Sequence, residues 1–231
     1  MSAYLDLAAL SAKAAATAAL PEALRDGRPS LWQLPMDSST TRRAAVLMLF
    51  GALDDIPAAS SKPLASADLD ILLIERAATL NDHPGQVAFP GGGVDALDVS
   101  LPACALREAQ EETGLDPLGV EVLGMLPEVP LPVSNFMVTP VVSWWVRQTP
   151  VDVVDFGESA RVFRIPVRDL LDPENRFTAV LARGGHNYRG PAFVVNDVVV
   201  WGFTAGILNY VFHELGWAVP WDEQREIPAP I

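Results

Sequence analysis

The sequence has little cysteine, little histidine and little positive charge. Its single cysteine, Cys104, excludes an internal disulfide and suits a reducing compartment, so we expect a cytoplasmic protein. Lysine and arginine number 16 against 29 aspartates and glutamates, which gives a formal net charge of -13. Nucleic-acid-binding surfaces are usually basic, so this balance argues against a nucleic-acid partner. His213-Glu214 lacks the second histidine of an H-E-x-x-H zinc motif.

Long apolar runs are also missing. The most apolar window, Val198 to Phe212, holds 15 residues with Asn209 inside, and is too short to span a bilayer. The alanine-rich stretch from Met1 to Leu24 is expected to be helical through about residue 19. It has no basic region at its start and carries Asp6, so it does not have the pattern of a signal peptide. We therefore expect no membrane partner.

The chain of 231 residues, half of them hydrophobic, suits one domain with a substantial core. Arg43–Leu53 and Leu69–Arg76 are apolar runs of strand length, as in buried strands. Further strands are expected at Val120–Met125, Phe136–Val146, Ala160–Ile165, Arg176–Leu181, Ala192–Val195 and Val198–Trp201, and a closing helix at Thr204–Leu215. Mixed strands with a few helices favour a three-layer α/β/α arrangement. We divide the chain into an N-terminal extension (1–42), a core (43–216) and a C-terminal tail (217–231).

A short acidic helix stands at the centre of the sequence. Pro102 suits its first turn and Gly114 its C-terminal end. Glu108, Glu111 and Glu112 stand at positions i, i+3 and i+4, so they share one helix face. Like charges on adjacent turns repel one another, and a hard divalent cation such as Mg²⁺ would neutralise them. A solvated acidic helix face is the alternative.

The residues around this helix resemble the Nudix hydrolase signature, G-x5-E-x7-R-E-U-x-E-E-x-G-U, where U is a bulky aliphatic residue. Gly92 begins the match, and Arg107 begins its R-E-A-Q-E-E-T-G-L half. Asp98 stands where the family usually has glutamate, and eight residues separate it from Arg107 instead of seven. The F-P-G-G-x-x-D-x-x-D run from Phe89 to Asp98 is similar to the coenzyme A diphosphatase-like branch of the family.

The resemblance to this branch covers roughly residues 44 to 215. Leu72 to Gly92 is similar to its upstream motif, L-L-T-x-R-[SA]-x3-R-x3-G-x3-F-P-G-G. Glu158 to Pro166 is similar to E-V-x-x-V-F-x-V-P, and Trp201 to Ala205 to W-G-x-T-A. Two positions depart from the upstream motif: Ile74 replaces a threonine, and Asn81 replaces a basic residue. If position 81 contacts coenzyme A, this loss weakens binding by about ten- to 150-fold.

The resemblance implies a Nudix-type three-layer α/β/α sandwich with a mixed central sheet and an N-terminal helical extension. It implies metal-dependent hydrolysis of a small-molecule nucleoside diphosphate derivative, with Mg²⁺ or Mn²⁺ as cofactor. We expect Arg107 to pair with Asp98 or another carboxylate of the signature and so to keep the metal ligands in position. The residues expected to act are Glu108 and Glu112 with Glu111 as metal ligands, Glu158 or Glu111 as general base, and Arg76, His83, Gly91 and Gly92 at the substrate.

Some of these residues are also consistent with a purely structural role. Glu158 is also consistent with a surface glutamate, and His83 with a turn residue that has no role. Cys104 is interpreted as a small buried residue and not as a nucleophile.

Three functions fit the whole pattern. The first is a coenzyme A diphosphatase that releases 3′,5′-ADP and 4′-phosphopantetheine. The second is a Nudix pyrophosphatase for another substrate, such as ADP-ribose, NADH or a nucleoside triphosphate. The third is a Nudix-fold binding module without catalysis, which the intact acidic residues Glu108, Glu111 and Glu112 argue against.

Overall fold

A computed structural model describes residues 2–16, 36, 39–54, 63–80, 83–183 and 186–230. Its helices are α1 (Ala3–Ala16), α2 (Leu101–Thr113), α3 (Val167–Leu171) and α4 (Gly202–Glu214). The larger sheet contains β1 (Arg42–Ala52), β2 (Leu69–Arg76), β3 (Val87–Ala88), β4 (Gly91–Gly93), β5 (Val120–Met125), β6 (Val129–Leu131), β7 (Phe136–Trp145) and β8 (Ser159–Pro166). The smaller sheet contains β9 (Arg176–Arg183), β10 (His186–Val195), β11 (Val198–Val200) and β12 (Glu226–Pro228).

Strand β1 lies at the centre of the larger sheet, which is mixed as the sequence predicts. It pairs in parallel with β7 and antiparallel with β2 and β4. The two antiparallel partners occupy different halves of β1, because Phe50 pairs with Ile71 of β2 and Ala45 pairs with Gly92 of β4. The glycine strand β4 is therefore fixed at the N-terminal half of β1, directly before the chain enters α2.

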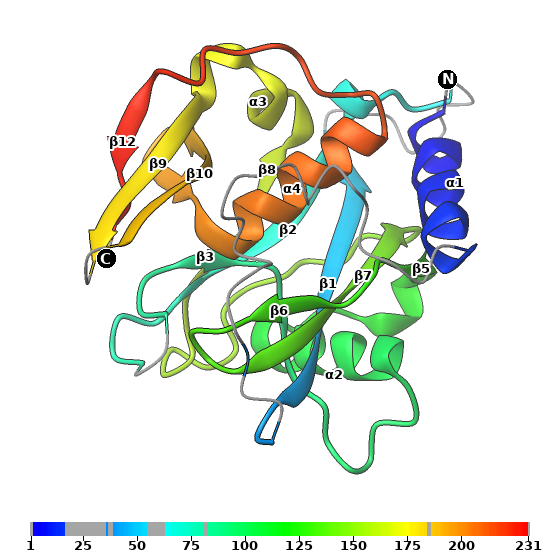
Figure 1. Cartoon of the computed structure of the whole chain (residues 1–231). Coiled ribbons are helices and arrows are strands. Elements are labelled where there is room, and N and C mark those ends of the chain that lie inside the picture. Colours follow the sequence, from blue (N-terminus) through cyan, green and yellow to red (C-terminus); the bar gives the residue numbers. More distant parts are fainter. Residues whose placement is uncertain are drawn as a thin grey trace.

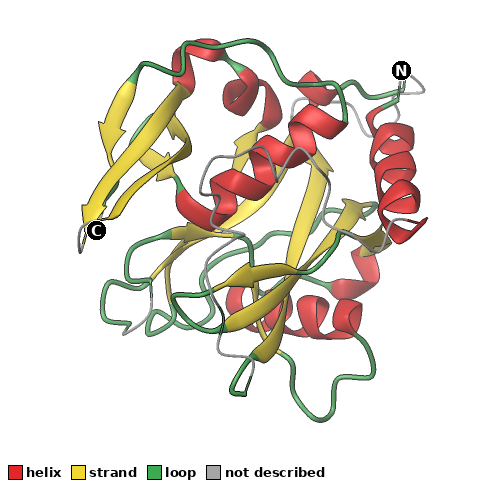
Figure 2. Ribbon diagram, viewed as in Figure 1, coloured by secondary structure: helices red, strands yellow, loops and turns green. Residues whose placement is uncertain are grey.

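Alternation along β1 explains why its sequence is a continuous apolar run. Side chains of a strand point to opposite faces in turn. Leu47 and Leu49 belong to the buried cluster that contains residues of α2, whereas Met48 and Phe50 belong to the cluster that contains residues of α1, α3 and α4. Helices therefore cover both faces of the sheet (Figures 1 and 2), and the expected α/β fold is confirmed.

The second sheet was not expected from the sequence. Its strands β9 and β10 pair antiparallel, and β12 joins β9 in parallel, with Glu226 opposite Thr178. Phe193 of β10 packs edge-on against Phe212 of α4, with ring centroids 6.2 Å apart. Helix α4 lies beside β10 (Figure 1), and its buried side chains share one cluster with strands of both sheets. The segment 217–231, expected to be only a tail, contributes β12.

Helix α1, which we assigned to an extension, is part of the core. Leu7 has no exposed surface and Leu10 is buried in the same cluster. Ser11 lies against Gly124 of β5, where a Cβ atom would stand 2.8 Å from the Cβ of Ser11. The expected helix is confirmed through Ala16, and residues 17–19 of that prediction lie outside the described residues.

Truncating Leu7 should therefore destabilise the whole fold. Leu7→Ala is expected to lower the free energy of unfolding by about 2–5 kcal/mol, the usual effect of a cavity at a buried leucine. Leu5 lies on the same helix but is 63% exposed, so Leu5→Ala is the matched control with an expected change within about 0.5 kcal/mol. Urea denaturation of both variants measures the difference. Equal changes in the two variants would show that α1 does not contribute to the core.

Candidate active site

Local signals at both ends fix the position of α2. The Ser100 hydroxyl caps its first turn by accepting a hydrogen bond from the Ala103 amide at 3.2 Å, and Pro102 lies in that turn. At the other end, Gly114 adopts a left-handed conformation with φ of 68°, and its amide donates to the Gln110 carbonyl at 2.9 Å. The expected limits of the helix are confirmed, so its glutamates stand at fixed spacings of three and four residues.

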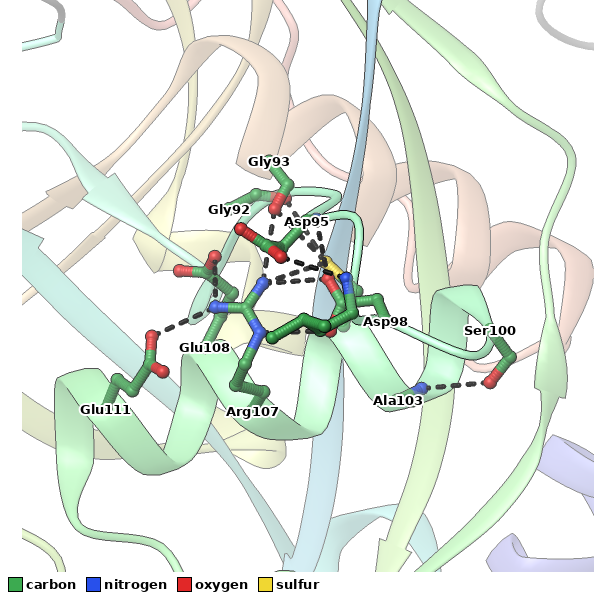
Figure 3. A network of polar contacts seen from close by, with 11 residues as sticks. Gly92, Gly93, Asp95, Asp98, Ser100, Ala103, Arg107, Glu108 and Glu111 are labelled. Carbon is green, nitrogen blue, oxygen red and sulfur yellow. Dashed lines mark hydrogen bonds and ion pairs between the residues drawn. The ribbon is translucent and has the colours of Figure 1, made fainter.

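Arg107 ties the preceding loop to the helix. Its Nε and one terminal nitrogen donate to the two carboxylate oxygens of Asp98 at 3.0 and 2.9 Å, and the same terminal nitrogen donates to the Gly93 carbonyl at 3.3 Å (Figure 3). This bidentate contact holds the pKa of Asp98 well below its usual range. The expected pairing of Arg107 with Asp98 is confirmed.

The other terminal nitrogen of Arg107 contacts two glutamates of the signature. It donates to Glu108 Oε1 at 2.8 Å and to Glu111 Oε2 at 3.0 Å (Figure 3). The Glu111 side chain is 57% exposed, against 20% for Glu108. Glu111 is thus the most exposed of the three glutamates on α2, and its roles as metal ligand or general base stay predictions.

Glu112 is buried and held by the glycine strand. Its Oε2 accepts a hydrogen bond from the Gly91 amide at 2.9 Å. Burial raises the pKa of Glu112 to about 7, the negative charge of Glu108 adds to this effect, and the Gly91 hydrogen bond opposes it. We expected Gly91 at the substrate; in the structure its amide positions a carboxylate, and a contact of Gly91 with substrate stays a prediction.

Gly92 makes room for Glu108. A Cβ atom at position 92 would stand only 2.4 Å from Glu108 Oε2, so no other residue fits with Glu108 in this position. Burial raises the pKa of Glu108, and the charges of Glu111 and Glu158 add to the effect while Arg107 opposes it. The glycine strand therefore places Glu108 and Glu112 side by side, and the role of Gly92 toward substrate stays a prediction.

Glu158 and Arg76 reach the same place from other elements. The backbone carbonyl of Glu158 accepts from the Ala77 amide at 2.9 Å, directly after Arg76 at the end of β2. The charge of Arg76 lowers the pKa of Glu112, and the charge of Glu158 raises it. The structure thus brings Glu158 and Arg76 to the carboxylates of α2, and their chemical roles stay predictions.

His83 lies in the turn that follows β2. Its backbone has a positive φ of 56°, and its Nδ1 is 3.0 Å from Oε1 of Gln86. Its Nε2 is buried and has no hydrogen-bond partner among the described residues, and the same holds for Nε of Arg76. The Gly85 amide donates to the Arg76 carbonyl at 3.2 Å, which closes this turn onto Arg76. The structure thus places His83 in a turn whose backbone is bonded to Arg76, and its role at the substrate stays a prediction. Asn81 lies outside the described residues.

The carboxylates of Glu108 and Glu112 suit a hard cation, but only one that takes few protein ligands. Among the residues that the structure describes, no group of three or more His, Cys, Asp or Glu side chains is arranged to hold a metal ion. Mg²⁺ typically takes only one or two carboxylates and completes its shell with water and substrate phosphates. Glu108 and Glu112 offer such a pair, and burial raises the pKa of both carboxyl groups, with the neighbouring glutamates adding to the effect.

Cys104 is buried in the cluster beneath α2. Its Sγ lies 3.5 Å from the Gly93 carbonyl, and burial raises the pKa of its thiol to about 11. A thiol that stays protonated is a poor nucleophile, in agreement with the interpretation of Cys104 as a packing residue.

Two residues beside the glycine strand were missed by the sequence analysis. The guanidinium of Arg42 lies 4.2 Å from the ring centroid of Phe136, and Phe136 lies next to Gly93. Alternation along β1 could have shown which face Arg42 is on. Val46 and Met48 face away from α2, and Arg42 is on the same face of the strand because it is separated from them by an even number of positions.

No helix in the described part of the chain is long and apolar enough to cross a bilayer. Residues 58–181, more than half of the chain, match the NUDIX domain family. The chain is 42% identical over 146 residues to Nudix hydrolase NudL of Cronobacter sakazakii, and 41% identical over 149 residues to NudL of Enterobacter sp.. Each alignment covers 63% of this chain and 75% of the relative.

Solved structures give more distant matches. A NUDIX hydrolase from Nitrosomonas europaea matches with a TM-score of 0.46 and 13% identity, over 82% of this chain and 80% of that one. The NUDIX domain of Shewanella oneidensis NrtR, solved in complex with ADP ribose, matches with a TM-score of 0.41 and 20% identity, over 66% of this chain and 87% of that one.

Proposed function

Because this chain belongs to the NUDIX domain family, we propose that it hydrolyses the diphosphate linkage of coenzyme A or a coenzyme A derivative. The proposed products are 3′,5′-ADP and 4′-phosphopantetheine. The chain is a Nudix hydrolase, and hydrolases of this family act on small nucleoside diphosphate derivatives, generally with a divalent cation such as Mg²⁺ or Mn²⁺. The choice of substrate is carried by the similarity of Leu72 to Gly92 to the coenzyme A-type motif, whose Arg76 lies near Glu112 in the structure.

The reaction requires help because a diphosphate repels a nucleophilic water and its leaving oxygen gains charge. A bound divalent cation would supply charge neutralisation and a more acidic water. Glu108 and Glu112 would hold it, and Arg107 keeps Glu108 in position. Arg76 offers a positive charge to a substrate phosphate. Glu158 is the proposed group that takes the proton from the attacking water, with Glu111 as the second candidate.

The single cysteine, Cys104, supports a cytoplasmic location. The net charge of -13 supports a small-molecule partner over a nucleic acid. A preference for ADP-ribose or NADH is the alternative to coenzyme A, since Ile74 and Asn81 depart from the coenzyme A motif. A non-catalytic binding module is disfavoured, because binding alone gives no reason to crowd Glu108 and Glu112 together.

A substrate panel tests the proposal. We expect kcat/KM with Mg²⁺ to be highest for coenzyme A, compared with its 3′-dephospho form, ADP-ribose and NADH. The product mixture from coenzyme A should contain 3′,5′-ADP and 4′-phosphopantetheine in equal amounts. Higher kcat/KM for ADP-ribose or NADH would assign the other Nudix substrate class, and no hydrolysis of any of the four would reject the proposal.

Removal of divalent cations should abolish this activity. The crowded carboxylates of Glu108 and Glu112 cannot accept a polyphosphate without added positive charge. In excess EDTA we expect turnover to fall to the uncatalysed background, and an excess of Mg²⁺ or Mn²⁺ to restore it. Turnover that continues undiminished in EDTA would rule out the metal-dependent mechanism.

A further inference from the structure

The distribution of ion pairs singles out two arginines near the site. Most described arginine side chains contact a carboxylate, namely those of Arg43, Arg107, Arg147, Arg161, Arg164, Arg168, Arg189 and Arg225. Within the described residues, no such ion pair involves Arg42, Arg76 or Arg176. Arg176 is buried in the core, with 1% of its surface exposed. Among the arginine side chains that the structure describes, Arg42 and Arg76 are therefore the two that lie outside both the core and these ion pairs, and Arg76 lies near Glu112.

Arg42 is exposed, yet several contacts fix its position. It stands directly opposite Phe136 in the parallel pairing of β1 with β7, and its guanidinium lies 4.2 Å from the centroid of that ring. Its backbone amide donates to the Asn135 carbonyl at 3.1 Å. A planar guanidinium that is already ordered on a ring loses less entropy when it binds two oxygens of a phosphate group.

The glycine strand β4 lies between this arginine and the carboxylates. The side-chain position of Gly92 faces Glu108, whereas a Cβ atom on Gly93 would stand 3.6 Å from the Phe136 ring. Neighbouring residues of a strand face opposite sides, so Phe136 and Glu108 lie on the two sides of β4. Since β4 consists of glycines alone, no side chain of this strand stands between them.

The net negative charge of the chain makes the position of each free arginine important for binding a phosphate group. With a net charge of -13, the protein repels a substrate that carries several phosphates, except where unpaired arginines are placed. Coenzyme A carries a 3′-phosphate on the ribose whose 5′ oxygen bears the diphosphate. Position 81 is basic in the upstream motif of the coenzyme A diphosphatase-like branch but is asparagine here, so this position offers no positive charge to that phosphate.

We propose that Arg42, held on the Phe136 ring, binds a phosphate group of the substrate other than the diphosphate that is cleaved. For coenzyme A this group is the 3′-phosphate. The inference rests on the proposed function and deepens it, because it names a residue that selects between coenzyme A and substrates without that phosphate. Arg42 is a binding residue in this account and takes no part in bond cleavage.

The test compares Arg42→Gln with Arg43→Gln in the full chain. Arg43 is the next residue on the same strand and is also exposed, but it is paired with Glu128 at 2.5 Å, which makes it a matched control for the loss of one positive charge. Calorimetry measures binding of two probes, adenosine 3′,5′-bisphosphate and 5′-ADP. We expect Arg42→Gln to weaken binding of the bisphosphate by about tenfold or more, as for a lost charged hydrogen bond, and to leave 5′-ADP nearly unchanged. Arg43→Gln should bind both probes as the native protein does.

Kinetics give a second readout. Arg42→Gln should raise KM for coenzyme A by a similar factor, with little change in kcat and little change for 3′-dephospho-coenzyme A. Phe136→Leu should produce a smaller change in the same direction, because the guanidinium remains but loses its ring. Rescue of bisphosphate binding by Arg42→Lys to an intermediate level would further support a charged contact.

Several results would overturn the inference. These are native-like bisphosphate binding by Arg42→Gln, equal weakening of both probes, or an equal loss in Arg43→Gln. Failure of the proposed function is a separate outcome. A protein that binds the bisphosphate through Arg42 but does not hydrolyse coenzyme A would retain this subsite and lose the proposed reaction. If the native chain hydrolyses coenzyme A and Arg42→Gln is equally active, the proposed reaction stands and the Arg42 subsite is rejected.

Discussion

Glu112→Gln and Glu108→Gln are each expected to lower kcat by on the order of 100-fold or more, the usual effect of losing a metal ligand or a general base. Glu112 lies against the Gly91 amide, and Glu108 against Gly92, so both carboxylates are fixed at the same edge of the glycine strand. Glutamine keeps the shape of each side chain but removes the charge that a cation requires. The measurement is kcat for coenzyme A at saturating Mg²⁺.

Glu111→Gln is the comparison within the same helix. Glu111 is 57% exposed and contacts Arg107, so its loss should reduce kcat less than the loss of Glu112 if it serves only as an additional ligand. Folding should be unaffected in all three variants, because the change is isosteric and relieves repulsion between like charges. Near-native kcat in Glu112→Gln or Glu108→Gln would show that the metal ligands lie elsewhere.

The second large effect is expected from a glycine. Gly92→Ala places a methyl group 2.4 Å from the Glu108 carboxylate, which must then move away. Because the displaced atoms are the end of a flexible side chain, the free energy of unfolding should change little. The carboxylate is nevertheless lost from its position, so kcat should fall by on the order of 100-fold, as in Glu108→Gln.

Gly93→Ala is the matched control for this glycine. Its methyl group would stand 3.6 Å from Phe136, which is an ordinary contact, so we expect kcat within a few-fold of the native value. Thermal unfolding of both variants, measured beside kcat, separates a local displacement from a general loss of structure. Equal kcat values in the two variants would show that the position of Glu108 against Gly92 has no importance for catalysis.

Local signals made α2 and the long strands predictable from the sequence. Pro102 and Gly114 bound the helix without reference to the rest of the fold, and the apolar run of β1 identifies a buried strand by itself. The short strands β6 and β12 have no such signal. Their residues, Val129–Leu131 and Glu226–Pro228, include prolines and become strands only by pairing with β7 and β9.

The candidate site was predictable in its acidic residues but not in its geometry. The spacing of Glu108, Glu111 and Glu112 places them on one helix face, but it does not reveal that Arg107 contacts Glu108 and Glu111 together. The contact of Gly91 with Glu112 depends on the pairing of β4 with β1, which joins residues far apart in the sequence. Strand β4 also lies beside Phe136, the ring that carries the Arg42 guanidinium, and no motif marks Arg42.

Glu108 and Glu112 are proposed to hold the divalent cation together. Titration of Mn²⁺ into the native protein and into Glu108→Gln, Glu112→Gln and Glu111→Gln, with free Mn²⁺ followed by electron paramagnetic resonance, tests this proposal without turnover. We expect the native chain to bind Mn²⁺, the first two variants to bind it at least about tenfold more weakly, and Glu111→Gln to lose less affinity. Native-like Mn²⁺ affinity in both Glu108→Gln and Glu112→Gln would contradict the proposal.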